Sequence, residues 1–288
     1  MMDTGKGKVL LRSACLTKFT FGEIELPKGW DCSAFTGVRV DYACDFSEGL
    51  AHAEPLENHR PFTKLHEADF APSFSDQAKD LFGERNVRMI VMDSFTDMFD
   101  AVFANRETHA KFFGKYGSFD RSEEFLRRYE IGSRLTLGEL EAAYRRFFAK
   151  VKKVYGAVPI VYLCFTARFD PRPDYRARCE AIEALVDRLA DEFAELHVYH
   201  LDFAERLGAD DDHPYHYTPE TYRRFAEKIV SREPGLSLVW RCPNWLKGVG
   251  RLFYEKKKLD RGVRKVRILG MSFSYVTRRK REKSAECA

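Results

Sequence analysis

The chain has 288 residues, of which 44% are hydrophobic and 14% aromatic, so it can bury a full core as one large domain or as a domain with an appendage. Its seven cysteines are odd in number and scattered, with no Cys-x-x-Cys pair and no Cys/His group at zinc-ligand spacing, which argues against a disulfide framework and against a metal site. The net charge of +4 is uneven, because the first 240 residues carry 33 basic and 40 acidic side chains while residues 241–288 carry 15 and 4.

Several protein classes lose their usual sequence support. The N-terminus lacks the apolar segment of a signal peptide, and no apolar run approaches membrane-spanning length, so we expect a reduced, cytoplasmic compartment. The chain also lacks the motifs Gly-x-Gly-x-x-Gly, P-loop, His-Glu-x-x-His and Gly-x-Ser-x-Gly. These absences disfavour a Rossmann dehydrogenase, a P-loop NTPase, a zinc protease and a standard α/β-hydrolase.

Apolar runs alternate with amphipathic segments along most of the chain. The runs predict strands at residues 8–12, 38–43, 87–92, 157–163 and 197–201. The periodic segments predict helices at residues 73–83, 122–129, 136–155, 174–195 and 218–230, of which the third begins with a Thr136–Glu139 capping box. This alternation predicts an α/β fold, a three-layer α/β/α doubly wound sheet of about five parallel strands over residues 1–235, followed by a basic extension over 236–288.

Two segments interrupt this alternation. Residues 46–72 are polar and contain His52, His59 and His66, whose spacing fits no metal motif, so we expect these histidines to be solvated. Residues 99–133 are too long for a plain connection and rich in aromatic and basic side chains. They indicate either a lid or binding insertion suited to a sugar or a nucleotide-like acyl carrier, or an extra helical layer over the sheet.

The end of the first strand reads Ser13-Ala14-Cys15-Leu16-Thr17. Open α/β sheets bind ligands at the carboxyl ends of their strands, and the first strand commonly flanks the point where the strand order reverses. Cys15 is therefore placed where such a fold carries a reactive group. Two interpretations stay open: Cys15 is a nucleophile, or it is a small buried apolar residue.

A second polar segment, residues 210–222, precedes the last predicted helix. Thr218 suits the N-cap and Pro219 the first helical position, so His216 lies directly before a helix whose apolar face packs on the core. Asp210, Asp212 and His213 lie a few residues upstream. His216 is either a catalytic base or part of a polar loop that caps the helix.

Taken together, these two segments resemble the SGNH (GDSL-like) esterase superfamily. Leu16-Thr17 matches the end of that family's Gly-Asp-Ser-Leu-Thr block and puts Cys15 in the place of its serine, while the residues before the last helix match its Asp–His block. A cysteine there resembles SGNH-like proteins of bacterial capsule and exopolysaccharide biosynthesis. Ser13 and Ala14 depart from the family's Gly-Asp.

The family's oxyanion-binding asparagine has no counterpart after the strand at residues 87–92. Asp93, Ser94 and Thr96 occupy this region, so the oxyanion role would pass to Ser94, Thr96 or backbone N–H groups, because an ionised aspartate cannot donate a hydrogen bond. Ser13 is an alternative nucleophile. Arg168 and Arg172, after the strand at residues 157–163, could bind a phosphate or a carboxylate at the same edge.

The resemblance implies acyl transfer, by an O-acyltransferase or an esterase, on a carbohydrate precursor of a surface polysaccharide. Cys15 would attack the carbonyl, His216 would take its proton, and Asp210, Asp212 or His213 would orient the imidazole. No cofactor is required, but coenzyme A or an acyl-CoA could be the co-substrate, because a thiol suits thioester exchange.

The alternative is a non-catalytic SGNH-like protein that binds a glycan or coenzyme A. In either case the basic extension, with its tryptophans and runs such as Lys256-Lys257-Lys258, could hold the protein at the inner face of a membrane, or it could be a solvated tail. No recognised motif supports nucleic acid as a partner.

Overall fold

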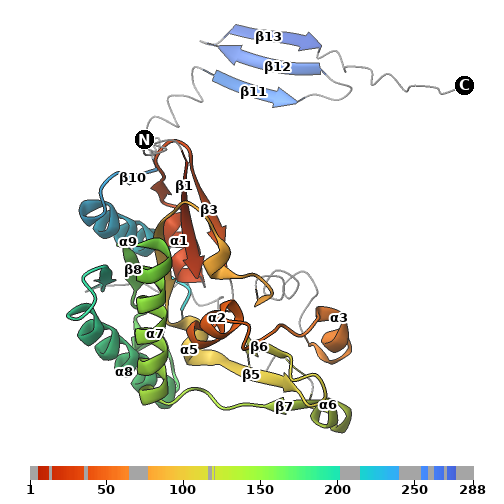
Figure 1. Cartoon of the computed structure of the whole chain (residues 1–288). Helices are drawn as coiled ribbons and strands as arrows, with labels where there is room; N and C mark the ends of the chain where they lie inside the picture. The colour runs from red at the N-terminus through yellow and green to blue at the C-terminus, as the bar shows by residue number, and fades with distance from the viewer. Residues whose placement is uncertain are drawn as a thin grey trace, which may run out of the picture. The chain divides into compact units, whose positions relative to one another are not determined.

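The structure, a computed structural model, describes residues 6–12, 15–35, 38–64, 77–115, 119, 121–201 and 215–239, and the backbone of three strands beyond residue 240 (Figure 1). The chain divides into two units, residues 1–239 and 240–288. In the second unit, the described strands form an antiparallel sheet of β11 (Tyr254–Lys258), β12 (Val263–Ile268) and β13 (Met271–Val276).

The first unit is built on a five-stranded sheet in which every neighbouring pair is parallel. Its strands, in spatial order, are β3 (Trp30–Ala34), β1 (Gly7–Arg12), β4 (Val87–Asp93), β8 (Ile160–Leu163) and β9 (Leu196–Tyr199). The chain first adds β3 on one side of β1 and then returns to place β4 on the other side. The strand order therefore reverses between β1 and β4, where doubly wound sheets of this order bind their ligands.

Helices cover both faces of this sheet (Figure 1). On one face, α1 (Cys15–Phe21) packs against α9 (Pro219–Arg232). On the other face, α7 (Leu137–Tyr155) packs between α2 (Val40–Ser47) and α8 (Pro173–Ala190). The α/β fold with a five-stranded parallel sheet and helices around it, predicted from the sequence, is confirmed.

Local sequence explains where several of these elements begin. Six of the seven residues of β4 are buried, as expected for a parallel strand covered on both faces. The Thr136–Glu139 capping box starts α7, with the Thr136 N–H donating to Glu139 Oε2 at 2.7 Å. Thr218 caps α9 and accepts a hydrogen bond from the Thr221 N–H, as its sequence predicts.

Short elements complete the unit. β2 (Ile24–Glu25) pairs antiparallel with β10 (Ser237–Leu238). The remaining short helices are α3 (Leu56–His59), α5 (Phe95–Phe99) and the 3-10 turns η1 (Arg60–Phe62), η2 (Leu81–Gly83) and η4 (Ala167–Phe169). Of the helix predicted at residues 73–83, only the turn η2 and residues 77–80 lie within the described part.

The predicted strand at residues 38–43 is wrong, because this segment begins α2. Val40, Ala43 and Cys44 follow helical spacing and are buried against α7, a pattern that a short alternating run cannot distinguish from a strand. In chain order, the second strand of the parallel sheet is instead β3, which was not predicted from the sequence. It is an edge strand whose five residues are all partly or fully exposed, so it lacks the apolar run that marks a central strand.

Residues 99–133 form a small antiparallel sheet, not an additional helical layer. It contains β5 (Asp100–Asn105), β6 (Lys111–Lys115) and β7 (Tyr129–Ile131), with α6 (Glu123–Arg128) beside it at one end of the unit (Figure 1). The predicted helix at 122–129 corresponds to α6 and is capped by Ser122. This sheet has its own aromatic core, which includes Phe62, Phe103, Phe112, Phe119, Phe125 and Tyr129.

Strand β6 joins this small core to the main one. Phe112 belongs to the aromatic core of the small sheet, whereas its neighbour Phe113 belongs to the main core, because successive strand residues point to opposite faces. Phe113 packs edge-on against Tyr42 of α2, with ring centroids 4.7 Å apart. The Gln77 side chain donates to the Phe113 carbonyl at 2.9 Å and accepts from the Phe113 N–H at 2.6 Å.

His59 is fully buried, so the expectation that it is solvated is wrong; His52 is exposed as expected, and His66 lies outside the described residues. The His59 ring stacks on Phe112, with centroids 4.3 Å apart. Burial, aided by the nearby charge of Arg128, lowers the pKa of His59 to about 3. His59 is therefore a neutral member of the aromatic core.

Among the described residues, no helix combines the length and the apolar character needed to cross a membrane.

This buried histidine should make the fold sensitive to mild acid. Its pKa lies below the ordinary value of about 6.5, so below pH 6.5 the unfolded chain binds a proton that the folded chain does not. The contribution of neutral His59 to the free energy of unfolding is fully present above pH 6.5. It decreases as the pH falls, by about 2 kcal/mol between pH 7 and pH 5. Urea unfolding at pH 7 and at pH 5 should show that His59→Phe does not lose this stability at the lower pH. His52→Gln, the control, should keep the wild-type pH dependence; an unchanged dependence in His59→Phe would contradict the prediction.

Candidate functional site

The carboxyl ends of β1 and β4 form the first candidate region. Cys15 is the first residue of α1 and is partly exposed, while Ser94 and Phe95 follow β4 directly. β1 and β4 are neighbours in the sheet, with Arg12 paired to Met92 at their ends. Cys15 and Ser94 therefore follow adjacent strands at the point where the strand order reverses.

An arginine at the end of β1 holds this region together. Arg12 is almost completely buried, and each of its three nitrogens donates a hydrogen bond: Nε to the Val38 carbonyl at 2.6 Å, Nη1 to the Asp93 carbonyl at 3.0 Å and Nη2 to Asp97 Oδ1 at 2.8 Å. Burial alone would lower the pKa of this guanidinium, but the attraction of Asp97 outweighs it and raises the pKa. Arg12 thus carries a buried, fully paired charge that joins β1, β4, α5 and the start of α2.

Two tyrosines extend this network to the next strand. Tyr144 of α7 donates to Asp97 Oδ2 at 2.8 Å, and its hydroxyl lies 2.9 Å from that of Tyr162 in β8. Burial raises the pKa of both tyrosines, so both stay protonated. Arg178 of α8 donates to the Asp97 carbonyl at 2.9 Å. Because both oxygens of the Asp97 carboxylate are engaged, its role in this structure is to stabilise the fold.

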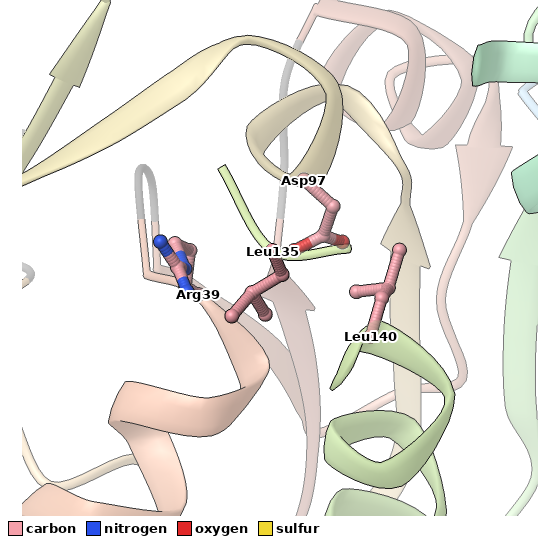
Figure 2. Close-up of a pocket in the computed structure, with 4 residues that line it drawn as sticks. All are labelled: Arg39, Asp97, Leu135 and Leu140. Carbon is pink, nitrogen blue, oxygen red and sulfur yellow. The ribbon is translucent and has the colours of Figure 1, made fainter. Parts of the chain in front are cut away.

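A small pocket lies beside this network, lined by Arg39, Asp97, Leu135 and Leu140 (Figure 2). Arg39 binds Asp41 through Nε at 3.1 Å and Nη2 at 2.8 Å. Its Nη1 is buried and has no hydrogen-bond partner among the residues described. The guanidinium also lies over the Phe113 ring, 5.5 Å from the centroid.

Asp93 anchors α1 to the end of β4. Its carboxylate accepts a hydrogen bond from Thr17 Oγ1 at 2.5 Å and another from the Phe95 N–H at 3.0 Å. Since Thr17 is two residues after Cys15, this contact fixes the turn of helix that presents the thiol. The two neighbouring candidates, Ser94 and Thr96, are both buried. Within the described part of the chain, Ser94 Oγ has no hydrogen-bond partner.

His216 is partly exposed and lies between two buried tyrosines. Tyr215 donates to Asp170 Oδ2 at 2.6 Å, and the Tyr217 hydroxyl accepts from the Thr166 N–H at 3.0 Å. Both partners lie in the loop between β8 and α8. The backbone of His216 is therefore held at the carboxyl end of β8.

Aromatic contacts connect this segment to the two other candidate regions. The Tyr215 ring lies edge-on to Phe95, directly after Ser94, with centroids 6.2 Å apart. Tyr222 of α9 packs against Phe19 of α1 at 5.2 Å. Because α1 and α9 pack together and both begin at the carboxyl edge of the sheet, Cys15, Ser94 and His216 all belong to segments at this edge.

The two candidate arginines follow β8 at the same edge, and they differ in their contacts. Arg168 is exposed and lies over the Phe169 ring, 4.5 Å from its centroid. Arg172 binds Asp170 through Nε at 2.9 Å and Nη2 at 2.7 Å. Burial alone would raise the pKa of Asp170, but hydrogen bonds from Arg172 and Tyr215 outweigh it and lower the pKa to about 2. Arg172 thus helps to hold Asp170, which accepts the hydrogen bond from the Tyr215 hydroxyl.

The other candidates lie outside the described residues, namely Ser13, Asp210, Asp212 and His213. Sequence reasoning missed the roles of Arg12, Asp97 and Tyr144. One signal was available: an arginine that ends an apolar central strand must find a buried partner.

Removing one partner of the buried ion pair should be far more costly than removing a surface pair. Arg12→Met leaves Asp97 buried without its cation, so urea unfolding should show a loss of about 3–5 kcal/mol. Asp97→Asn should destabilise in the same direction, and the double variant should lose less than the two single losses added together. Arg145→Met, which removes the exposed pairs of Arg145 with Glu141 and Glu192, is the control and should unfold near the wild-type midpoint. An Arg12→Met chain as stable as this control would refute the assignment.

No protein-family model matches the chain, and no curated protein matches it either.

Proposed function

We propose that the protein catalyses acyl transfer, with Cys15 as the nucleophile and His216 as its base. One observation carries the proposal: Cys15 begins α1, His216 lies three residues before the start of α9, and these two helices pack together at the edge of the sheet where the strand order reverses. A partly exposed thiol and a partly exposed imidazole at this edge are the two groups that thiol-based acyl transfer requires.

The reaction would proceed in two steps. His216 removes the thiol proton of Cys15, and the sulfur attacks the carbonyl carbon of an ester or thioester. The tetrahedral intermediate then collapses, its alcohol or thiol leaves with the proton from His216, and the acyl group stays on the sulfur. In the second step, water or a sugar hydroxyl gives its proton to His216 and attacks the acyl carbon. The C–S bond then breaks, and the Cys15 sulfur leaves and takes the proton back from His216. Water makes the protein an esterase, and a sugar hydroxyl makes it an acyltransferase.

Ser94 is the side chain best suited to stabilise the oxyanion. Its hydroxyl is a donor without a partner in the described structure, and it directly follows β4, the neighbour of the strand that leads to Cys15. Ser94 is completely buried, so this role requires the oxyanion to form directly against the end of β4. Asp93 cannot serve, because its carboxylate accepts hydrogen bonds from Thr17 and Phe95.

The substrate class follows from the SGNH resemblance and stays a prediction. It implies a carbohydrate precursor as acceptor and an acyl-CoA as a suitable donor, with no further cofactor. Arg168 is exposed at this edge, and a guanidinium is suited to bind a phosphate of such a donor. Binding of the basic extension to an anionic membrane also stays a prediction.

The alternative is a protein that binds a glycan or coenzyme A without turnover. Asp93 ends β4 and Asp97 lies four residues later, and the carboxylates of both already form hydrogen bonds that stabilise the fold. This observation favours the alternative. Binding of coenzyme A by calorimetry, with no hydrolysis of acetyl-CoA or activated acetyl esters and no transfer to saccharides, would select this alternative.

Replacing Cys15 should abolish turnover. We expect Cys15→Ala and His216→Ala each to lower kcat/KM for an activated acetyl ester at least about 1000-fold, because each removes a member of a nucleophile–base pair. Mass spectrometry of a rapidly quenched reaction should find the acyl group on the peptide that contains residue 15. Cys32→Ala is the matched control, since Cys32 is an exposed thiol on β3, and it should keep full activity. Undiminished turnover in Cys15→Ala would remove Cys15 from the chemistry and leave Ser13 as the alternative.

The anchoring of His216 can be tested separately. Tyr215→Phe removes only the hydroxyl that binds Asp170, so His216 should be less well positioned, and kcat should fall about tenfold with little change in KM. Tyr155→Phe is the control, because it also removes a tyrosine hydroxyl that donates a hydrogen bond, in this case to the Leu81 carbonyl, away from this edge. Equal kcat values in the two variants would show that Tyr215 has no positioning role.

A further inference from the structure

A cysteine, a glutamate and a histidine from three different elements converge near the ends of β8 and β9. Cys164 follows β8 and is buried, His200 follows β9, and Glu183 lies on α8. Their ligand atoms all lie within 4.8 Å of one another, and this is the sole group of three such residues found in the part of the chain that is described. Cys164 Sγ lies 3.9 Å from His200 Nε2.

We propose that Cys164, Glu183 and His200 bind one Zn²⁺ ion, with Asp187 as the fourth ligand. This site is independent of the acyl-transfer proposal, because it shares no residue with it. The ion would link α8 to the ends of β8 and β9, so its role would be structural.

The distances suit a small ion. Sulfur and nitrogen ligands of a tetrahedral zinc ion lie about 3.6 Å apart, given Zn–S and Zn–N bonds of about 2.3 Å and 2.1 Å. The Cys164–His200 separation of 3.9 Å is already close to this value. Glu183 would move by about 1 Å, the difference between 4.8 Å and the ideal separation, which a flexible glutamate side chain can absorb.

Asp187 is outside the group of three whose ligand atoms lie within 4.8 Å of one another, so its exposed side chain would turn toward the ion to become the fourth ligand. It lies one helical turn after Glu183, so both carboxylates share one face of α8. Asp187 Oδ1 is 2.8 Å from His200 Nε2. Zinc on Nε2 requires that nitrogen to be unprotonated, which ends this hydrogen bond and leaves the Asp187 carboxylate beside the ion. When the metal binds, the proton of the Cys164 thiol passes to solvent, and the neutral imidazole carries its one ring proton on Nδ1.

The ligand types select the metal. A thiolate and an imidazole favour Zn²⁺ over Mg²⁺ and Ca²⁺, which prefer oxygen ligands. One thiolate, one imidazole and two carboxylates would make four ligands, the coordination number that zinc adopts in structural sites.

The backbone around the ligands is well fixed. The Cys164 N–H donates to the Tyr199 carbonyl at 3.1 Å, which continues the β8–β9 pairing, and Lys228 Nζ donates to the His200 carbonyl at 2.7 Å. The Cys179 thiol donates to Glu183 Oε1 at 3.5 Å and orients that carboxylate. Supporting contacts of this kind hold the ligands of metal sites in place.

The experiment uses the full chain, purified without a metal-binding tag and stripped with a chelator. Co²⁺ serves as the probe, because a cysteine ligand gives a thiolate-to-cobalt charge-transfer absorption and a tetrahedral site gives intense ligand-field bands. We expect both signals to saturate at one equivalent and one equivalent of Zn²⁺ to displace them. Zn²⁺ should also raise the Tm of the wild-type chain.

Variants test the ligand assignment. Cys164→Ala should lose the charge-transfer band, and Asp187→Asn, a change at a partly exposed side chain, should weaken Co²⁺ binding at least about tenfold. The controls Cys32→Ala and His197→Gln should bind as the wild type does, because Cys32 is exposed on β3 and His197 binds Glu233 instead. If circular dichroism shows that Cys164→Ala is unfolded, His200→Gln and Asp187→Asn decide the question, and wild-type affinity in both would overturn the proposal.

The results for this site and for the acyl-transfer site are distinguishable. Cys15→Ala and His216→Ala should keep the cobalt spectrum even though they lose turnover. A wild-type chain without a stoichiometric charge-transfer band, or a band that persists in Cys164→Ala and disappears in Cys15→Ala, would overturn the zinc site.

Discussion

The structure of the sheet edge depends on one buried charge, the guanidinium of Arg12. A cation removed from water is tolerated only when its partners are close and well oriented, and Arg12 has all three nitrogens engaged, with Asp97 as the partner that carries the opposite charge. This requirement fixes the ends of β1 and β4 relative to α5. Through Tyr144 it also fixes α7 and β8. The candidate residues at this edge therefore lie beside strand ends whose relative positions are fixed.

The fold could be predicted from sequence where the local signal and the tertiary environment agree. The central strand β4 is an uninterrupted apolar run, and the capping residues Thr136 and Thr218 mark helix starts that depend only on near neighbours. Prediction failed for the edge strand β3 and for α2, because an exposed strand has no apolar run and a short buried helix can mimic one. The burial of His59 is invisible locally, since it is created by rings more than forty residues away in the chain.

The candidate site shows the same difference between what local sequence predicts and what long-range contacts determine. The positions of Cys15 and His216 followed from the ends of predicted elements, and these elements lie at one edge of the sheet. The residues that support them came from long-range contacts, such as Thr17 with Asp93 and Tyr215 with Asp170. The residues of the proposed zinc site were missed because motif searches use spacing along the chain, whereas the parallel pairing of β8 with β9 brings Cys164 and His200 together from 36 positions apart.

Strand β6 has a consequence for how a substrate could approach the protein. Its neighbouring residues Phe112 and Phe113 enter two separate cores, and Gln77 binds both backbone groups of Phe113. Any hinge that swung the small sheet away would have to expose Phe113, at a cost of about 1.5–3 kcal/mol for the ring alone. The small sheet is thus held on the main core, so a ligand of the proposed site would have to enter past side chains and loops nearer to Cys15.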